Sequence, residues 1–170
     1  MSYSREALTN VALALLAKDE KRMLALLQEN PGMVNARMRS STLLHLAADV
    51  GFVEVVRKLL ALGAAVDARN VLGMTPLHHA AIKSYAEVVE LLIANGAEVN
   101  AQTTEGYTPL HVAASKSSAK IVRVLLDHGA RINVKNKWGL TPLDMVEEGG
   151  NAEVVELLRA KGAREGHRLF

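Results

Sequence analysis

The 170-residue sequence contains no cysteine, and aromatic side chains make up only 4% of it. Without cysteine, the chain can form neither a disulfide framework nor a thiolate metal site. No apolar run approaches the 18 or so residues of a membrane-spanning helix, and the amino terminus lacks the basic and apolar segments of a secretory signal. We therefore expect a soluble, cytoplasmic protein that does not enter membranes, and we expect neither a metal nor a cofactor.

The charge balance gives little reason to expect nucleic acid as a partner, because the net charge is only +2. The basic residues are unevenly distributed, however. Residues 116–137 carry six lysines and arginines, and Asp127 is the only acidic residue among them. A run of this kind is usually a solvated face, and the alternative is a surface that attracts an acidic partner or nucleic acid.

One four-residue phrase recurs along the chain at a fixed interval. Its copies are Thr42-Leu43-Leu44-His45, Thr75-Pro76-Leu77-His78, Thr108-Pro109-Leu110-His111 and the altered Thr141-Pro142-Leu143-Asp144. The four threonines stand 33 residues apart. Self-similarity at this period indicates a stacked-repeat architecture, in which each unit packs only against its neighbours.

Each residue type in the phrase has a structural role at the start of a helix. Threonine can cap the helix by accepting a hydrogen bond from a free amide of the first turn. Proline fits the first helical position because it has no N–H to leave unbonded, and leucine points into the core. For the histidine we expect a buried imidazole bonded to backbone and threonine oxygens of neighbouring units. The alternative is a catalytic or metal role, but a ligand set would not recur at one place in every repeat.

The residues between successive phrases predict two short helices and a turn in every unit. The first helix carries a pair of alanines and the second a pair of β-branched residues: Ala47-Ala48 with Val55-Val56, Ala80-Ala81 with Val88-Val89, and Ala113-Ala114 with Ile121-Val122. Each second helix is followed by a glycine, which can adopt the left-handed conformation that closes a helix. Because helices of about ten residues are marginal alone, we expect each pair to bury its apolar stripe against its neighbours.

The two ends of the chain depart from the repeat. The segment before Asn30 predicts two helices that form a degenerate first copy. In the last copy, Glu147 and Arg159 replace apolar residues, and an unpaired charge would be costly to bury beneath another unit. We therefore expect the stack to end there and the chain to be complete. The expected divisions are an N-terminal capping helix pair at 1–36, repeats at 37–69, 70–102 and 103–135, and a C-terminal capping repeat with a tail at 136–170.

The 33-residue period and the Thr-Pro-Leu-His-x-Ala phrase resemble those of the ankyrin-repeat family. The resemblance covers residues 36–163, with departures at Leu43, Asp144 and Val146. It implies an all-α solenoid of stacked helix-turn-helix units, each with a protruding β-turn finger. It also implies a protein-binding module without chemistry of its own, whose partners lie along the fingers and the first helices on the concave side.

A comparison of the copies separates scaffold positions from positions that vary, and the varying positions map onto the contact surface that the resemblance implies. Several carry apolar side chains where they would be exposed, which is typical of an interaction site. Trp138 is the only tryptophan, and tryptophan and tyrosine are common interface hot spots. The alternative is that Trp138 packs over Lys135 or a neighbouring finger. The partner-binding candidates are Arg39, Asp49, Val71, Leu72, Met74, Ile82, Lys83, Glu105, Tyr107, Lys116, Lys137, Trp138 and Leu140.

We interpret the chain as a module that binds another protein, as an adaptor, scaffold or inhibitor, and as a monomer when alone. The alternative is a binder of nucleic acid or of an acidic surface through residues 116–137. We do not expect an enzyme, because no catalytic set can be assembled without the structural histidines. The adjacent pair His78-His79 does not indicate a zinc site, since neighbouring residues on a helix do not face one another.

Overall fold

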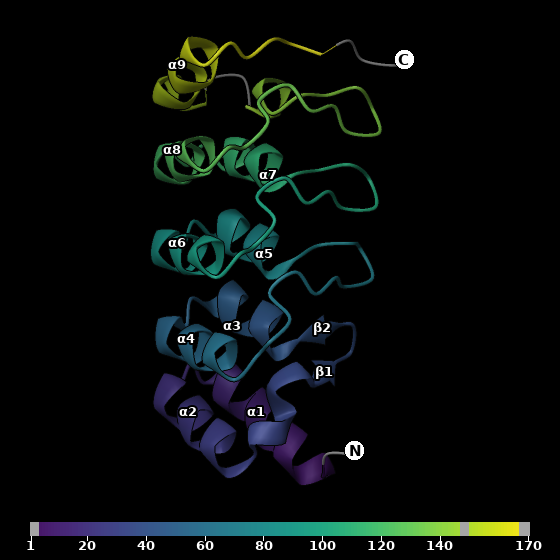
Figure 1. Ribbon diagram of the computed structural model, residues 1–170, viewed down its shortest axis with the longest axis vertical. Helices are drawn as coiled ribbons and strands as arrows, with labels where there is room; N and C mark the ends of the chain where they lie inside the picture. Colours follow the sequence, from purple (N-terminus) through teal and green to yellow (C-terminus); the bar gives the residue numbers. More distant parts are fainter. Residues whose placement is uncertain (1–3, 147–149, 167–170) are drawn as a thin grey trace.

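The computed structural model describes residues 4–146 and 150–166 and shows an elongated stack of helix pairs (Figure 1). The N-terminal pair comprises α1 (Arg5–Leu16) and α2 (Glu20–Glu29), and the short 3-10 helix η1 (Pro31–Asn35) follows it. The units after this pair each contain a first helix, a second helix and the loop that precedes the first helix. We call these loops the fingers and define them as residues 37–41, 70–74, 103–107 and 136–140.

The first helices lie in one row and the second helices in another, while the fingers project on the side away from the second helices (Figure 1). The first helices are α3 (Leu43–Val50), α5 (Pro76–Lys83), α7 (Pro109–Ser115) and the 3-10 helix η2 (Leu143–Met145). The second helices are α4 (Val53–Ala61), α6 (Ala86–Ala94), α8 (Ala119–Asp127) and α9 (Ala152–Ala160). The expected all-α solenoid of helix-turn-helix units is confirmed.

Packing between consecutive units follows the repeated small and β-branched residues. The three alanine pairs of α3, α5 and α7 are fully buried, so the first helices approach one another closely. Val55, Val88 and Ile121 of the second helices are also fully buried. Burial of this apolar surface supplies the stability that helices of seven to nine residues lack by themselves.

Local backbone geometry agrees with the expected caps. The side chains of Thr42 and Thr108 each accept a hydrogen bond from the backbone N–H of the histidine three residues later. The second helices end near glycines in the left-handed region, with φ of 84° at Gly63 and 83° at Gly129. The same conformation is forced on Ser84, which stands where the preceding unit has Gly51.

The first finger differs from the later ones. It is a short antiparallel hairpin of β1 (Arg37–Met38) and β2 (Ser41–Thr42), in which Arg37 pairs with Thr42 and Met38 with Ser41. Arg39 lies at its tip with a φ of 57°. The hairpin gives this finger a turn of two residues, and Arg39 adopts the left-handed backbone conformation that glycine has in the later fingers.

The C-terminal end of the stack is closed by the tail. Asp144 replaces the histidine of the phrase, and its Oδ2 accepts hydrogen bonds from the backbone N–H groups of Thr141 and Gly166, both at 2.7 Å. Arg159 is exposed and lies 3.7 Å from Glu165. Glu147, the other charge expected at this end, lies outside the described residues.

No helix in the described part of the chain combines the length and apolar character needed to cross a lipid bilayer.

Candidate functional site

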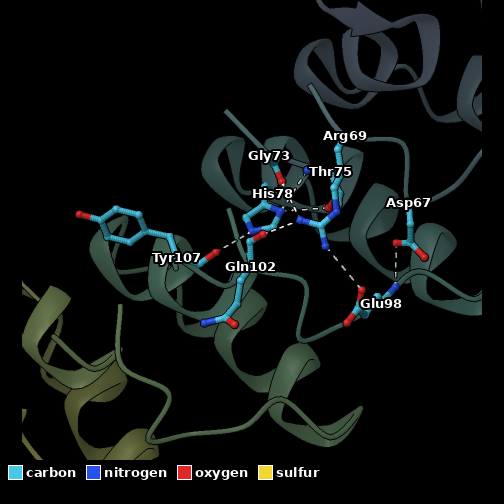
Figure 2. Close-up of polar contacts among 8 residues, drawn as sticks. All are labelled: Asp67, Arg69, Gly73, Thr75, His78, Glu98, Gln102 and Tyr107. Atoms are coloured by element: carbon cyan, nitrogen blue, oxygen red, sulfur yellow. Dashed lines mark hydrogen bonds and ion pairs between the residues drawn. The ribbon is translucent and has the colours of Figure 1, made fainter. Parts of the chain in front are cut away.

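Three buried imidazoles join each unit to the next finger. The Nδ1 atoms of His45, His78 and His111 lie 2.8 to 2.9 Å from the threonine hydroxyl of the same phrase. Their Nε2 atoms lie 2.9, 3.0 and 3.1 Å from backbone carbonyls in the following finger. Figure 2 shows this arrangement for His78, which lies between Thr75 and Tyr107. The expected structural role of the histidines is confirmed.

These carbonyls belong to Met74, Tyr107 and Leu140, three of the partner-binding candidates. The histidines therefore fix the backbone from which the candidate side chains project. Each first helix supports the finger of the unit that follows it, so the contact surface is built from pairs of units rather than from single ones.

The geometry and the burial together keep these histidines neutral. The backbone N–H of the threonine in each phrase donates to Nδ1, so the ring proton resides on Nε2 and is donated to the carbonyl. Burial lowers the pKa of His45 and His78 to about 4 and also lowers the pKa of His111. A neutral ring with both nitrogens bonded has no capacity left for a metal or a substrate. Within the described ranges, no three histidine, aspartate or glutamate side chains gather to hold a metal ion.

The fingers also contact one another directly. The backbone N–H of Thr104 donates to the carbonyl of Leu72 at 3.0 Å, and that of Lys137 donates to the carbonyl of Glu105 at 2.8 Å. The approach is so close that a Cβ on Gly106 would lie 3.0 Å from the Cα of Asn136. The second, third and fourth fingers therefore form a continuous row.

An arginine between the second and third fingers reinforces this row. The guanidinium group of Arg69 donates to the carbonyls of Gly73 and Gln102, at 3.3 and 2.5 Å, and lies 3.8 Å from Glu98 (Figure 2). Glu98 in turn donates its backbone N–H to Asp67. These contacts hold the turn of one unit against the turn of the next.

A groove of about 380 Å³ lies between the finger row and the first helices. Six of the thirteen candidates line it: Leu72, Met74, Ile82, Glu105, Tyr107 and Lys116. The structure therefore brings together residues from two fingers, from α5 and from the C-terminal cap of α7 that the sequence comparison had selected separately. None of the six is fully buried, and Leu72 is 58% exposed.

Five further residues line the groove and were not among the partner-binding candidates: Thr103, Thr104, Val112, Ser115 and Met145. Thr104 and Ser115 occupy the same repeat positions as the candidates Val71 and Ile82, so the repeat register could have found them. Val112 and Met145 share one position on the first helix, where an apolar residue suggests core packing. The structure leaves both half-buried, so they form the floor of the groove.

The remaining candidates do not line the groove. Asp49 lies 3.1 Å from Nδ1 of His79 and 3.8 Å from the ammonium group of Lys83, in a polar cluster toward the N-terminal end. Val71 is 75% exposed, and Lys137 and Arg39 are also exposed. Leu140 is half-buried in the last finger.

Trp138 lies against the neighbouring finger and is half-buried. The centroids of the Trp138 and Tyr107 rings are 5.6 Å apart, with an angle of 46° between the rings. The centroids of the Tyr107 and His111 rings are 5.9 Å apart, and the two rings are perpendicular. Burial, together with the nearby Glu105 carboxylate, raises the pKa of Tyr107, which keeps its hydroxyl protonated. The packing alternative considered for Trp138 is therefore observed, and the residue as a whole is not fully buried.

The basic stretch does not form one surface. Lys120 and Arg123 belong to α8, which lies on the side of the stack away from the fingers (Figure 1), and Arg123 pairs with Glu153 at 3.0 Å. Lys137 belongs to the last finger, and Lys116 borders the groove. The cations of α8 and of the last finger therefore lie on different sides of the molecule.

Two family models match the chain. One, described as ankyrin repeats in three copies, matches residues 11–103. The other, described as ankyrin repeats in many copies, matches residues 92–146. The matched spans include all four copies of the phrase and every residue that lines the groove. None of the curated proteins compared matches the sequence.

Proposed function

The chain belongs to the ankyrin-repeat family, and we propose that it binds another protein through the surface formed by its fingers and first helices. Ankyrin repeats are generally protein-protein interaction modules, and proteins built from them are typically non-enzymatic. The binding would make the chain an adaptor, a scaffold or an inhibitor of its partner.

The observation that carries this proposal is the apolar groove between the fingers and the first helices. Leu72, Met74 and Ile82 remain accessible although the stack has a complete core beneath them. Accessible apolar residues that gather in one place, with polar residues around them, are typical of a binding site for another molecule. No stability is gained from leaving them exposed, so their placement supports a role in recognition.

The mechanism that fits this surface is recognition by a preformed shape. The histidine bridges, the Arg69 contacts and the finger-to-finger hydrogen bonds fix the backbone before any partner arrives. A surface that is already ordered loses little conformational entropy on binding, so more of the contact energy appears as affinity.

Affinity capture from an extract of the source organism tests the proposal. The baits are the wild-type chain, Trp138→Ala, and the control Leu16→Ala, which removes a side chain that is 82% exposed on α1, outside the groove. We expect at least one protein to bind the wild type and the control and to be depleted on Trp138→Ala. For that protein, Trp138→Ala should weaken binding by about 2 kcal/mol, which is roughly 30-fold in Kd.

Circular dichroism should show the same fold for all three baits, with every melting temperature well above the temperature of the capture. The proposal fails if every captured protein binds Trp138→Ala as tightly as the wild type, or if nothing binds the wild type specifically.

A further inference from the structure

We infer that the groove binds a linear segment of the partner that inserts a large apolar side chain and places an acidic residue beside Lys116. This inference rests on the proposed function, because it names the chemistry of the partner at the same surface. It follows from the floor of the groove, from the charges at its edges and from the polar atoms that are already bonded within the chain.

The floor of the groove is apolar and adaptable. Ile82, Val112 and Met145 come from three successive first helices and are all half-buried. Met74 and the Tyr107 ring close the side toward the fingers. Burying this surface under an apolar side chain removes it from water, which is favourable in proportion to the area covered, and the methionines can adjust their shape to the occupant. A hollow of about 380 Å³ is too small for a folded domain, but it admits side chains of an inserted segment.

The two edges of the groove carry opposite charges. Lys116, at the end of α7, and Glu105, in the third finger, are both exposed. Neither forms an ion pair with any residue in the described ranges. Lys83 occupies the position of Lys116 in the preceding unit, but it does not line the groove and lies 3.8 Å from Asp49, so Lys116 supplies the positive charge on the helix side. A segment lying between the edges is therefore favoured when its acidic side chain faces the helices and a basic one faces Glu105.

The neutral polar groups of the groove are already engaged within the chain. The Thr104 hydroxyl donates to the carbonyl of Leu72 at 3.1 Å, and the Ser115 hydroxyl donates to that of Val112 at 2.9 Å. Thr103 Oγ1 accepts from the backbone N–H groups of two residues of its own finger. A polar metabolite would need such groups to converge on it. Because these hydroxyl groups are already bonded within the chain, the ligand of the groove is selected by the charges at the edges and by the apolar floor.

Selection from a phage library of random dodecapeptides on the immobilised full-length chain tests this inference. We expect the enriched peptides to share a large apolar residue close to Asp or Glu. The same selection on Lys116→Glu should replace the acidic preference by a preference for Lys or Arg, because the substitution reverses the charge at an exposed position without touching the core. The wild-type and variant selections are run on the same library and compared position by position.

A synthetic peptide from the enriched group then locates the binding site by fluorescence anisotropy. Its Kd should rise by about tenfold or more on Ile82→Asp, which places a charge in the floor of the groove. The control Leu16→Asp places the same charge on an exposed apolar position of α1 and should leave the Kd unchanged. Melting temperatures of both variants show that they are folded at the temperature of the assay.

Three results would overturn the inference: no enrichment on the wild type, an acidic preference that persists on Lys116→Glu, or a Kd that Ile82→Asp does not change. None of these decides the proposed function. A natural partner that is captured by the wild type and lost on Trp138→Ala would still show protein binding at the finger row, outside the groove. If both the affinity capture and the peptide selection fail, the proposed function and the inference about the groove are both wrong.

Discussion

His45, His78 and His111 each bond a threonine of their own unit and a carbonyl of the next finger, so their protonation state is coupled to the stacking of the units. A proton added to Nδ1 would face the backbone N–H of the threonine, which is itself a donor. Protonation therefore breaks the contact at the start of the helix as well as placing a charge in the core.

The stability of the protein should therefore decrease in mild acid. The folded-state pKa of His45 and His78 is about 4, below the ordinary value of 6.5, so the unfolded chain binds more protons between these limits. The neutral histidines contribute to the free energy of unfolding. We expect this contribution to be complete above about pH 6.5 and to be lost as the pH falls toward 4. The loss is at most about 1.4 kcal/mol per histidine for each pH unit. Urea denaturation at several pH values between 7.5 and 4.5 measures it.

His78→Gln isolates the contribution of one buried histidine, whose pKa is lowered to about 4 by burial. His78→Gln should be less stable than the wild type at pH 7 and should show a shallower dependence of stability on pH. If stability falls with pH equally steeply in the wild type and in His78→Gln, the loss of stability in acid does not come from this buried histidine.

Single residues also show what the sequence could predict. The role of the histidines followed from their recurrence at one place in each unit, because a contact between neighbouring units recurs wherever units stack. The packing of Trp138 over Lys135 or a neighbouring finger was left as an alternative. The direction of a side chain in a finger depends on the neighbouring finger, and the repeat pattern does not encode that local fit.

At the scale of elements, the fingers depend on close approach between glycine turns and the backbone of the next finger. Gly106 and Gly129 both have a φ of 83°, which is costly for any other residue. They differ in their surroundings, because a Cβ on Gly106 would meet Asn136 at 3.0 Å whereas a Cβ on Gly129 would meet nothing within 4 Å. The pair therefore separates the cost of the backbone conformation from the cost of pushing the fingers apart.

We expect Gly129→Ala to destabilise the fold by about 1 kcal/mol, the cost of the left-handed conformation for a residue with a side chain. Gly106→Ala should cost roughly 1 kcal/mol more, because the added methyl group overpacks the contact with the fourth finger. Chemical denaturation of the two variants beside the wild type gives the difference directly. Equal destabilisation would mean that the fingers move apart freely.

The final unit shows an element that the sequence predicted only in part. The altered phrase indicated that the last unit differs, and the second helix was found as α9. The described part of its first helix is a short 3-10 helix, and Asp144 bonds the Gly166 amide instead of supporting a further finger. This contact joins residues 22 positions apart without any repeated pattern, so nothing in the period could have indicated it.

At the scale of the whole molecule, the period of 33 residues was sufficient to predict a stack, because a unit that cannot bury its own apolar face must pack against a copy of itself. The groove was harder to predict. Its floor consists of positions such as Val112 and Met145, which have the character of core residues and become accessible only through the spacing between fingers and helices. The comparison of the copies therefore identified several residues that line the groove, but it did not predict that they enclose a groove.

Hydrogen exchange of the chain with and without its captured partner tests the central claim most directly, since it reports which backbone amides a partner covers or stabilises. The account predicts slower exchange in the fingers at 70–74 and 103–107 and in α5 and α7, with little change in α4, α6 and α8. Protection confined to those second helices, with the fingers exchanging as in the free chain, would contradict it.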